Sequence, residues 1–253
     1  MASSRPPLVI LSCEALRGIL EPRLPEDTSI HFLDYHFHLR PQDLKDEIER
    51  RLADLPEPSV VLIGYGLCGN AVAGIRTDRH TLVILRTDDC IAMVLGSYAA
   101  YRREQGSNPG TYYLTRGWIQ SGGHPLHEYR DYVERYGDET ADMLMDTLYR
   151  HYSRLCLIGF SEEELDECRP EAKRIAEFCE QKLGMTYEER LGSDALIQHW
   201  LDSAADPSAR SENLVVIPPG QVVDPFLFQR DPGEGGAFAA QPRVSTRTGE
   251  TND

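Results

Sequence analysis

The hydrophobic residues of the chain alternate between short continuous runs and longer segments with helical spacing. Short apolar runs rich in β-branched residues are typical of buried strands when turn residues end them. In the first half of the chain such runs lie at residues 8–11, 60–63 and 82–85. Longer segments repeat apolar residues every three or four positions, as between residues 41 and 55, which predicts amphipathic helices.

The second half continues this alternation of strands and helices. Strands are expected at residues 155–158, 186–191 and 214–217. Two helical patterns are split at Gly137. A third begins with a capping box at Ser161, passes Pro170 with a kink or as two short helices, and continues to Leu183. Alternating strands and helices predict an α/β fold, with one or two mostly parallel sheets that carry helices on both faces.

Turn residues and prolines mark the ends of the remaining predicted elements. A strand is expected over residues 29–39, a short helix between Gly69 and the run at 82–85, and a helix from residue 91 to about 105. The glycine-rich stretch 106–125 reads as loop. We expect an N-terminal α/β lobe at 1–125, a C-terminal α/β lobe at 126–228, and a disordered tail at 229–253, which is rich in Gly, Pro, Ser and Thr.

Each of the three apolar runs in the first half is followed by a cysteine. These residues are Cys13, Cys68 and Cys90. Open α/β sheets bind ligands beyond the carboxyl ends of their strands. Neighbouring strands lie about 5 Å apart, so cysteines at adjacent strand ends can converge.

Three interpretations of these cysteines stay open. They are buried, inert thiols, or one of them is a nucleophile with a lowered pKa at a helix N-terminus, or all three bind one metal site. Three thiolates can hold an iron–sulfur cluster, or zinc or iron, with one coordination position left open. We favour the shared site, because the three cysteines have the same placement after a strand.

The net charge and the composition limit the kinds of molecule that the protein is expected to bind. The chain has 253 residues, with 41 acidic against 26 basic side chains and a formal net charge of −15. Nucleic acids and anionic membranes require a basic surface, so neither is expected as a main partner. No long apolar run predicts a membrane span, and the polar start MASSRPP does not resemble a signal peptide. We therefore expect a cytoplasmic protein with reduced cysteines.

The turn after the second apolar run matches a dinucleotide-binding pattern. Gly64, Gly66 and Gly69 have the spacing G-x-G-x-x-G, and Asp88 follows at the next strand end, where it could bind a ribose. This pattern suggests an NAD-type oxidoreductase as an alternative. The glycines also fit a turn required only for close packing.

Charged and aromatic residues near these turns are further site candidates. Arg86 and Asp89 precede Cys90, and Glu14 follows Cys13. An arginine beside cysteines favours an anionic ligand, and carboxylates at strand ends can support a bound metal. Aromatic residues between 112 and 118, including Trp118, form either a lid over the site or a packed loop corner.

Six short motifs together resemble a family of unknown function from bacteria and methanogenic archaea. They are LSCE, YGLCGN, LRTDDC, LGSYAAY, PGTYY and GW, within residues 8–159. The positions matching the family pattern are Cys13, Cys68, Asp89, Cys90, Gly110 and Trp118. Members of this family are encoded beside corrinoid-dependent methyltransferases of the trimethylamine and glycine-betaine type. The resemblance implies a role in that methyl-transfer system but supplies no established activity.

These observations lead to three hypotheses. In the first, Cys13, Cys68 and Cys90 bind a metal or iron–sulfur cluster that serves corrinoid-dependent one-carbon metabolism. The residues predicted to bind the cofactor are Gly66, Gly69, Gly110 and Trp118. Around the three cysteines, the surrounding charged groups would be Glu14, Arg86 and Asp89. In the second, the glycine turn binds a nicotinamide nucleotide. In the third, the chain is a non-catalytic partner of a methyltransferase or corrinoid protein. Whether the protein is an enzyme stays open.

Overall fold

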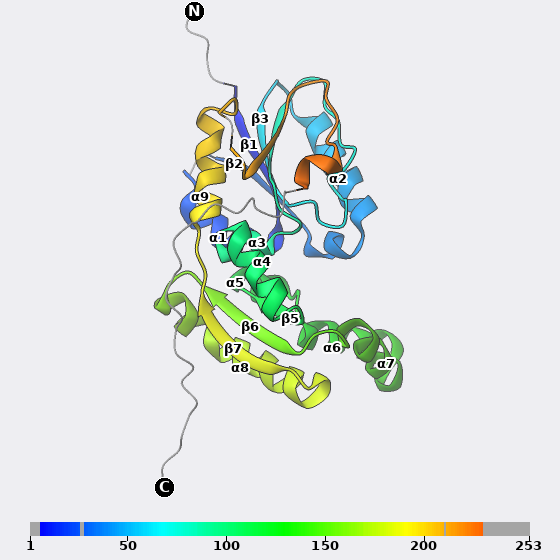
Figure 1. Ribbon diagram of the computed structural model, residues 1–253. Coiled ribbons are helices and arrows are strands. Elements are labelled where there is room, and N and C mark those ends of the chain that lie inside the picture. Colours follow the sequence, from blue (N-terminus) through cyan, green and yellow to red (C-terminus); the bar gives the residue numbers. More distant parts are fainter. Residues whose placement is uncertain (1–5, 26–27, 210, 230–253) are drawn as a thin grey trace, which may run out of the picture. The chain divides into compact units, whose positions relative to one another are not determined.

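The computed structural model describes residues 6–25, 28–209 and 211–229, and these residues form an α/β protein with two sheets (Figure 1). The chain divides into two compact units. The first contains the described residues up to Tyr101 and those from Ser193 onward, and the second contains Arg102–Gly192. The lobe boundary expected near residue 125 lies inside the second unit. From residue 230, the tail expected to be disordered lies outside the described residues.

The first unit is built on a five-stranded sheet with the order β2-β1-β3-β4-β8. Its strands are β1 (Leu8–Cys13), β2 (Ser29–Leu33), β3 (Val60–Gly64), β4 (Thr81–Leu85) and β8 (Leu214–Ile217). The first four are parallel, and β8 pairs antiparallel with β4 at one edge. Because β1, β3 and β4 are direct neighbours, their carboxyl ends meet at one edge of the sheet.

Helices cover both faces of this sheet. Those of the first unit are α1 (Arg17–Leu20), α2 (Pro41–Asp54), α3 (Ile91–Leu95), α9 (Ala195–Asp202) and the start of α4 (Tyr98–Ser107). In Figure 1, α2 lies on one face and α9 on the other. The α2 helix buries Leu44, Ile48 and Leu52, the stripe that its periodicity predicted. On the opposite face, the indole N–H of Trp200 in α9 donates to the carbonyl of Val83 in β4 at 3.2 Å.

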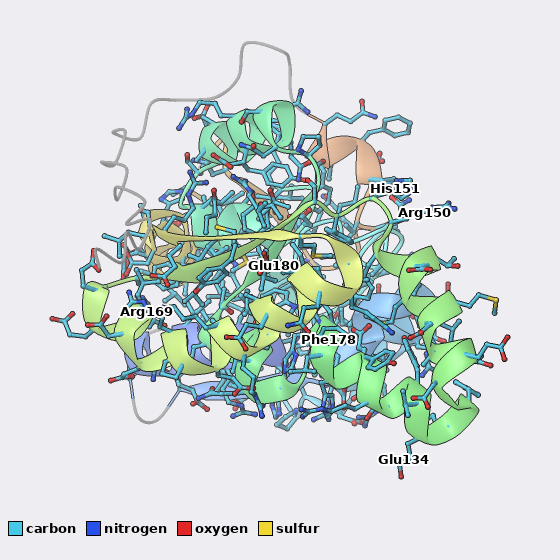
Figure 2. All side chains as sticks on the ribbon, turned by 90° about the horizontal axis from the view of Figure 1, so that it is seen from below. Glu134, Arg150, His151, Arg169, Phe178 and Glu180 are labelled. Carbon is cyan, nitrogen blue, oxygen red and sulfur yellow. The ribbon has the colours of Figure 1, made fainter. Side chains whose placement is uncertain are left out.

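The second unit contains a three-stranded parallel sheet with the order β5-β6-β7. Its strands are β5 (Thr111–Leu114), β6 (Arg154–Gly159) and β7 (Thr186–Leu191), and its helices are α5 (Arg116–Ser121), α6 (Pro125–Tyr136), α7 (Asp138–Tyr149) and α8 (Glu162–Leu183). Leu155 and Leu157 of β6 share one core with Ile175 of α8. Phe178 of α8, labelled in Figure 2, lies with its ring centre 5.2 Å from that of Tyr129 in α6.

Several predicted elements are confirmed, together with the α/β class. The α8 helix passes Pro170 and reaches Leu183 as one helix, so the alternative of two short helices is wrong. Its N-terminus has the expected cap, because the Ser161 hydroxyl accepts a hydrogen bond from the Glu164 N–H at 3.2 Å. The Glu164 carboxylate in turn accepts the N–H of Phe160 at 2.8 Å, which completes the cap.

Other predicted elements are wrong, and turn chemistry explains two of them. The strand expected over residues 29–39 ends at Leu33, because the Asp34 side chain accepts the N–H of His36 and begins a 3₁₀ turn. The helix expected from 91 to 105 is broken at Gly96, whose φ of 79° ends α3. Within the stretch 106–125, expected to be loop, the structure has β5, α5 and the start of α6.

The short helix predicted between Gly69 and β4 is also absent. The described residues between β3 and β4 form turns and one isolated bridge. Positive φ angles at Cys68, Gly69 and Asn70 are incompatible with a right-handed helix at that point. This correction matters for function, because the dinucleotide hypothesis requires a helix there.

The N-cap of α6 predicts an acid-sensitive stability. His124 is buried, and its ring Nδ1 accepts the N–H of His127 at 3.3 Å. Burial lowers the pKa of His124 from 6.5 to about 4, so folding favours the neutral ring. The contribution of His124 to the free energy of unfolding is therefore complete above pH 6.5. It falls as the pH drops toward 4, by up to about 3 kcal/mol.

Urea unfolding of the wild type and His124→Asn at pH 7 and pH 5 measures this effect. Asparagine is a good N-cap that does not titrate, so the variant should lose less stability between the two pH values. Replacement of the exposed His151 by Asn is the control and should behave as the wild type. Equal losses in the wild type and His124→Asn would refute the assignment.

Candidate functional site

The three strand-end cysteines lie together at the carboxyl edge of the five-stranded sheet. Cys13 ends β1, Cys68 lies in the turn after β3, and Cys90 is the N-cap of α3 after β4. Ionisation of Cys68 or Cys13 would raise the pKa of Cys90, so the three sulfurs interact electrostatically. We call these three residues the cysteine cluster.

Two glycines allow the three strand ends to come this close. A Cβ atom on Gly64 would lie 2.3 Å from the Ser12 hydroxyl, directly across from it on β1. A Cβ atom on Gly66 would lie 2.6 Å from the Thr87 hydroxyl and 2.7 Å from the Thr87 carbonyl oxygen. Any larger side chain would push the strand ends apart. Thus Gly66, predicted as a cofactor-binding residue, brings the Cys68 turn against the loop that carries Cys90.

Hydrogen bonds fasten the Cys68 turn to the same neighbouring loop. The N–H of Leu67 donates to the Thr87 carbonyl at 2.9 Å, and that of Cys68 donates to the Asp88 carbonyl at 2.8 Å. Cys68 and the two residues after it have φ angles of 45°, 63° and 70°. The left-handed conformation is unfavourable for Cys68, and such strain is concentrated at binding sites. Gly69 adopts the same region without that cost.

The sulfur atoms receive backbone N–H groups but lie in surroundings that disfavour charge. Backbone N–H groups favour the charged form of all three thiols: those of Gly66 and Cys90 lower the pKa of Cys68, that of Ala15 lowers the pKa of Cys13, and that of Cys90 lowers the pKa of its own side chain. Burial outweighs these donors and raises the pKa of Cys13 to about 11 and that of Cys68 to about 12.

The Cys90 pKa is also raised well above 9, first by burial and then by Cys68. Cys68 keeps part of its residue surface exposed, although its sulfur is surrounded by protein. At neutral pH all three side chains are neutral thiols when no cation is bound. Neutral thiols are poor nucleophiles, so the geometry does not favour the nucleophile interpretation.

Tyr65 is a member of the site that the sequence interpretation missed. It lies between Gly64 and Gly66, with 4% of its surface exposed. Its hydroxyl has no well-formed hydrogen bond within the described residues, and the weakly polar Cys13 thiol lies beside it. Burial, followed by the three cysteines, raises the pKa of Tyr65. A polar aromatic residue between two glycines at a strand end was the available signal.

Among the predicted charged residues, Asp89 is the one whose charge affects the pKa of two of the cysteines. Its carboxylate accepts the N–H of Ile91 at 2.8 Å and the hydroxyl of Tyr101 at 3.0 Å. Its negative charge raises the pKa of both Cys68 and Cys90. Asp89 is therefore held in a fixed orientation beside the cysteines.

The other two charged candidates contact different groups. The Glu14 carboxylate makes a two-point ion pair with the Arg17 guanidinium, at 2.5 and 2.9 Å. The Arg86 guanidinium donates to the carbonyl oxygens of Leu227, at 2.8 Å, and Gln229. Arg86 thus attaches the C-terminal segment to the end of β4.

Gly110 and Trp118, the two remaining candidates, belong to the second unit. A Cβ atom on Gly110 would lie 2.6 Å from the carbonyl oxygen of His151, so this glycine permits close packing before β5. Trp118 is partly buried in α5 and packs against the core of its unit. Both therefore have packing roles within that unit.

The glycine turn lacks two features of a dinucleotide site. A Rossmann turn leads into a helix whose N-terminus faces the pyrophosphate, whereas turns occupy this stretch of the chain. The N–H groups of Leu67 and Cys68 already donate to the neighbouring loop. The geometry therefore does not favour the nicotinamide hypothesis.

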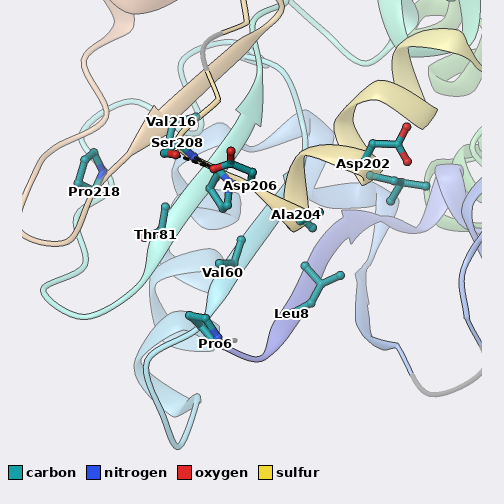
Figure 3. Close-up of a pocket in the computed structure, with 13 residues that line it drawn as sticks. Pro6, Leu8, Val60, Thr81, Asp202, Ala204, Asp206, Ser208, Val216 and Pro218 are labelled. Carbon is teal, nitrogen blue, oxygen red and sulfur yellow. Dashed lines mark hydrogen bonds between the residues drawn. The ribbon is translucent and has the colours of Figure 1, made fainter. Parts of the chain in front are cut away.

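Two cavities lie at opposite edges of the five-stranded sheet. The one beside the cysteine cluster has a volume of about 300 Å³, and residues that flank Cys68 line it together with part of the C-terminal segment. The larger one, about 860 Å³, adjoins the starts of β1, β3 and β4, at Leu8, Val60 and Thr81 (Figure 3). The small cavity adjoins the Cys68 turn through Leu67 and Asn70, and none of the three cysteines is among the residues that line it.

The cluster is not arranged as a finished metal site. Throughout 6–25, 28–209 and 211–229, no three His, Cys, Asp or Glu side chains form a group ready to hold a metal ion. Neutral thiols have no electrostatic reason to converge, because they are not ligands until they lose their protons. In the same described residues, no helix has the length and apolar character to cross a membrane.

Comparison with known proteins gives one match. The model of the family described as Protein of unknown function (DUF1638) matches residues 32–201. This range includes Cys68 and Cys90 and parts of both units, whereas Cys13 precedes it. No curated protein and no solved structure matches the chain. The expected resemblance to an uncharacterised family is thus confirmed.

The close approach at Gly66 predicts a large effect of one added methyl group. Gly66→Ala should destabilise the first unit by about 1–3 kcal/mol, because the Cβ atom would overlap Thr87. The control is Gly106→Ala in α4, where a Cβ atom meets nothing within 4 Å. This change should be neutral or slightly stabilising. Urea unfolding measures both, and equal stabilities would contradict the packing role of Gly66.

Proposed function

The chain belongs to the family described as Protein of unknown function (DUF1638), and from its site we propose that it binds a thiophilic metal ion or an iron–sulfur cluster. The proposed ligands are Cys13, Cys68 and Cys90. The observation that carries this proposal is that three adjacent parallel strands bring these thiols to one edge, where backbone N–H groups favour the charged form of each sulfur. Such N–H donors stabilise sulfur that carries negative charge.

The electrostatics of the cluster support a cation as its ligand. Burial and mutual repulsion keep Cys13, Cys68 and Cys90 protonated, and the Asp89 carboxylate adds to that repulsion. A bound metal cation reverses each of these effects, because it supplies the positive charge that three thiolates lack. The backbone donors then hydrogen-bond to thiolates rather than to neutral thiols.

Three cysteine ligands leave one coordination position for another group. A tetrahedral metal with three protein ligands keeps its fourth position for solvent or substrate, and an iron–sulfur cluster with three cysteines keeps one iron accessible. A cavity of about 300 Å³ lies beside the Cys68 turn, where Leu67, Asn70 and Asp88 help to line it, and it is large enough for a small molecule. The site therefore suits either electron transfer or binding of a small ligand.

We assign this site to corrinoid-dependent one-carbon metabolism, and the assignment rests on the motif resemblance alone. A cluster here would carry electrons for reactivation of an oxidised corrinoid, or its open iron would bind a substrate. The partner would be a corrinoid protein or a methyltransferase. Asp89, held by Ile91 and Tyr101, would orient solvent or a proton at the edge of the site.

Metal analysis of anaerobically purified protein tests the shared site. We expect stoichiometric iron or zinc, with acid-labile sulfide if a cluster is present, in the wild type. Cys13→Ala, Cys68→Ala and Cys90→Ala should each lose most of it. The matched control is Cys156→Ala, which removes a fully buried thiol from β6 of the second unit. Absence of metal from the folded wild type, or equal metal in all four variants, would overturn the proposal.

Added zinc should also stabilise the metal-free protein. A ligand present at a hundred times its Kd stabilises the folded state by about 2.7 kcal/mol, provided that it does not bind the unfolded chain. Zn²⁺ should therefore raise the Tm of the reduced wild type and of Cys156→Ala in differential scanning fluorimetry. It should leave the Tm of the triple variant of Cys13, Cys68 and Cys90 unchanged. Equal shifts in both would locate the zinc elsewhere.

A further inference from the structure

The larger cavity of the first unit lies at the amino edge of its sheet, where β1, β3 and β4 begin. Its volume is about 860 Å³ (Figure 3). Three of its wall residues are cross-strand neighbours, because Leu8 lies opposite Val60, and Val60 lies opposite Thr81. Residues opposite each other in neighbouring strands point to the same face of a sheet. One face of the sheet therefore forms the floor of this cavity.

The chain after α9 supplies a second part of the wall. The hydrogen bond from Trp200 to Val83 holds α9 on the sheet, and the helix ends at Asp202. The residues that follow, 204–208, line the cavity, and so does Leu201 at the end of the helix. Protein interiors are close-packed, so a mostly apolar space of this size is a candidate site for another molecule.

The charged groups of this wall are acidic. Asp202 and Asp206 line the cavity, and no Lys, Arg or His is among the described residues that do. The Asp206 carboxylate has a fixed orientation, since its Oδ1 atom accepts the N–H of Ser208 at 3.1 Å and the hydroxyl of Ser208 at 2.6 Å. These bonds, the hydroxyl first, lower the pKa of Asp206, so the group is charged at neutral pH. A carboxylate has about four lone-pair sites, so Asp206 can accept further hydrogen bonds.

We propose that this cavity binds a primary alkylammonium ion, with its apolar body on the sheet floor and its N–H groups on the Asp206 carboxylate. Asp206 is exposed, whereas Leu8 and Val60 offer apolar surface, so the site suits a ligand whose charged end stays near solvent. An anion would meet two carboxylates and no cation on the wall. The net charge of −15 also raises the concentration of cations near the protein. Binding here does not depend on the proposed metal site.

Titration of the full chain with hexylammonium, followed by ¹H–¹⁵N NMR, measures both the Kd and the place of binding. We expect the amide signals of Val60, Ala205 and Ser208 to shift. 1-Hexanol has the same chain length without the charge and should bind about threefold to fivefold more weakly, and hexanoate more weakly still. From butylammonium to hexylammonium, the Kd should fall with each added CH₂ group by up to about fourfold, the value of one buried methylene.

Asp206→Asn tests the role of the carboxylate. Asparagine keeps a side-chain oxygen that accepts from Ser208 and removes the charge, so the turn should be preserved. The Kd for hexylammonium should rise about threefold to fivefold, as for an exposed ion pair. The matched control is Asp224→Asn, because the exposed Asp224 carboxylate lies outside the cavity and accepts the N–H of Phe226 at 2.9 Å in the same kind of turn. This variant should bind as the wild type does.

Four outcomes would overturn the proposal. An absence of shifts at the amino edge, with hexylammonium in excess, would mean that the cavity does not bind it. Shifts spread over the acidic surface, with the same Kd in Asp206→Asn and Asp224→Asn, would show nonspecific attraction of a cation. Equal Kd values for 1-hexanol and hexylammonium would remove the role of the carboxylate. Shifts of the same amides on dilution of the ligand-free protein would show that a second copy of the chain occupies the edge.

Discussion

The close approach of three parallel strand ends is the constraint on which the candidate site depends. At Gly64 the β3 strand meets the Ser12 side chain of β1, and at Gly66 the following turn meets Thr87 beyond β4. In both places a methyl group would overlap atoms of the neighbouring strand or loop. The missing side chains let backbone groups of one loop reach the next, so that the N–H of Cys68 bonds to Asp88. Packing, rather than any one side chain, therefore brings the cysteines together.

This packing has an electrostatic consequence. It encloses three thiols, a tyrosine hydroxyl and the Asp89 carboxylate in one region, where every ionisation opposes the others. The region is stable as a set of neutral thiols, and under the proposed function it would become a ligand set only on binding a cation. Metal binding and deprotonation are then one event, which is the general behaviour of cysteine sites. The strained φ of Cys68 and the incomplete bonding of Tyr65 are consistent with a site that is completed by its ligand.

The unit that contains the cluster is completed by the last described part of the chain. After the second unit, α9 packs Trp200 against β4, and β8 adds the antiparallel edge strand. The segment after β8 pairs with the loop before β4, where the N–H of Gly74 donates to Val223. Arg86 then attaches that segment at the carboxyl edge of the sheet. Residues far apart in sequence thus build the walls of the small cavity beside Cys68.

Much of this organisation was determined by the sequence itself. The β-branched runs fixed three strands, the spacing of Leu44, Ile48 and Leu52 fixed α2, and Ser161 with Glu164 fixed the start of α8. Each of these depends on neighbours within a few positions, so local pattern was sufficient. The placement of a cysteine after each of β1, β3 and β4 could also be predicted from the sequence. The elements around residues 106–125 were missed, because Gly and Pro signals concealed short segments that tertiary packing holds in place.

Only the tertiary structure decided whether the cysteines meet. That outcome depends on the strand order, in which β1, β3 and β4 are neighbours, and strand order is set by pairing between distant residues. The left-handed turn at Cys68 and the incomplete bonding of Tyr65 follow from contacts across that sheet edge. A sequence records which side chains are available, whereas burial and close approach determine which of them share a site.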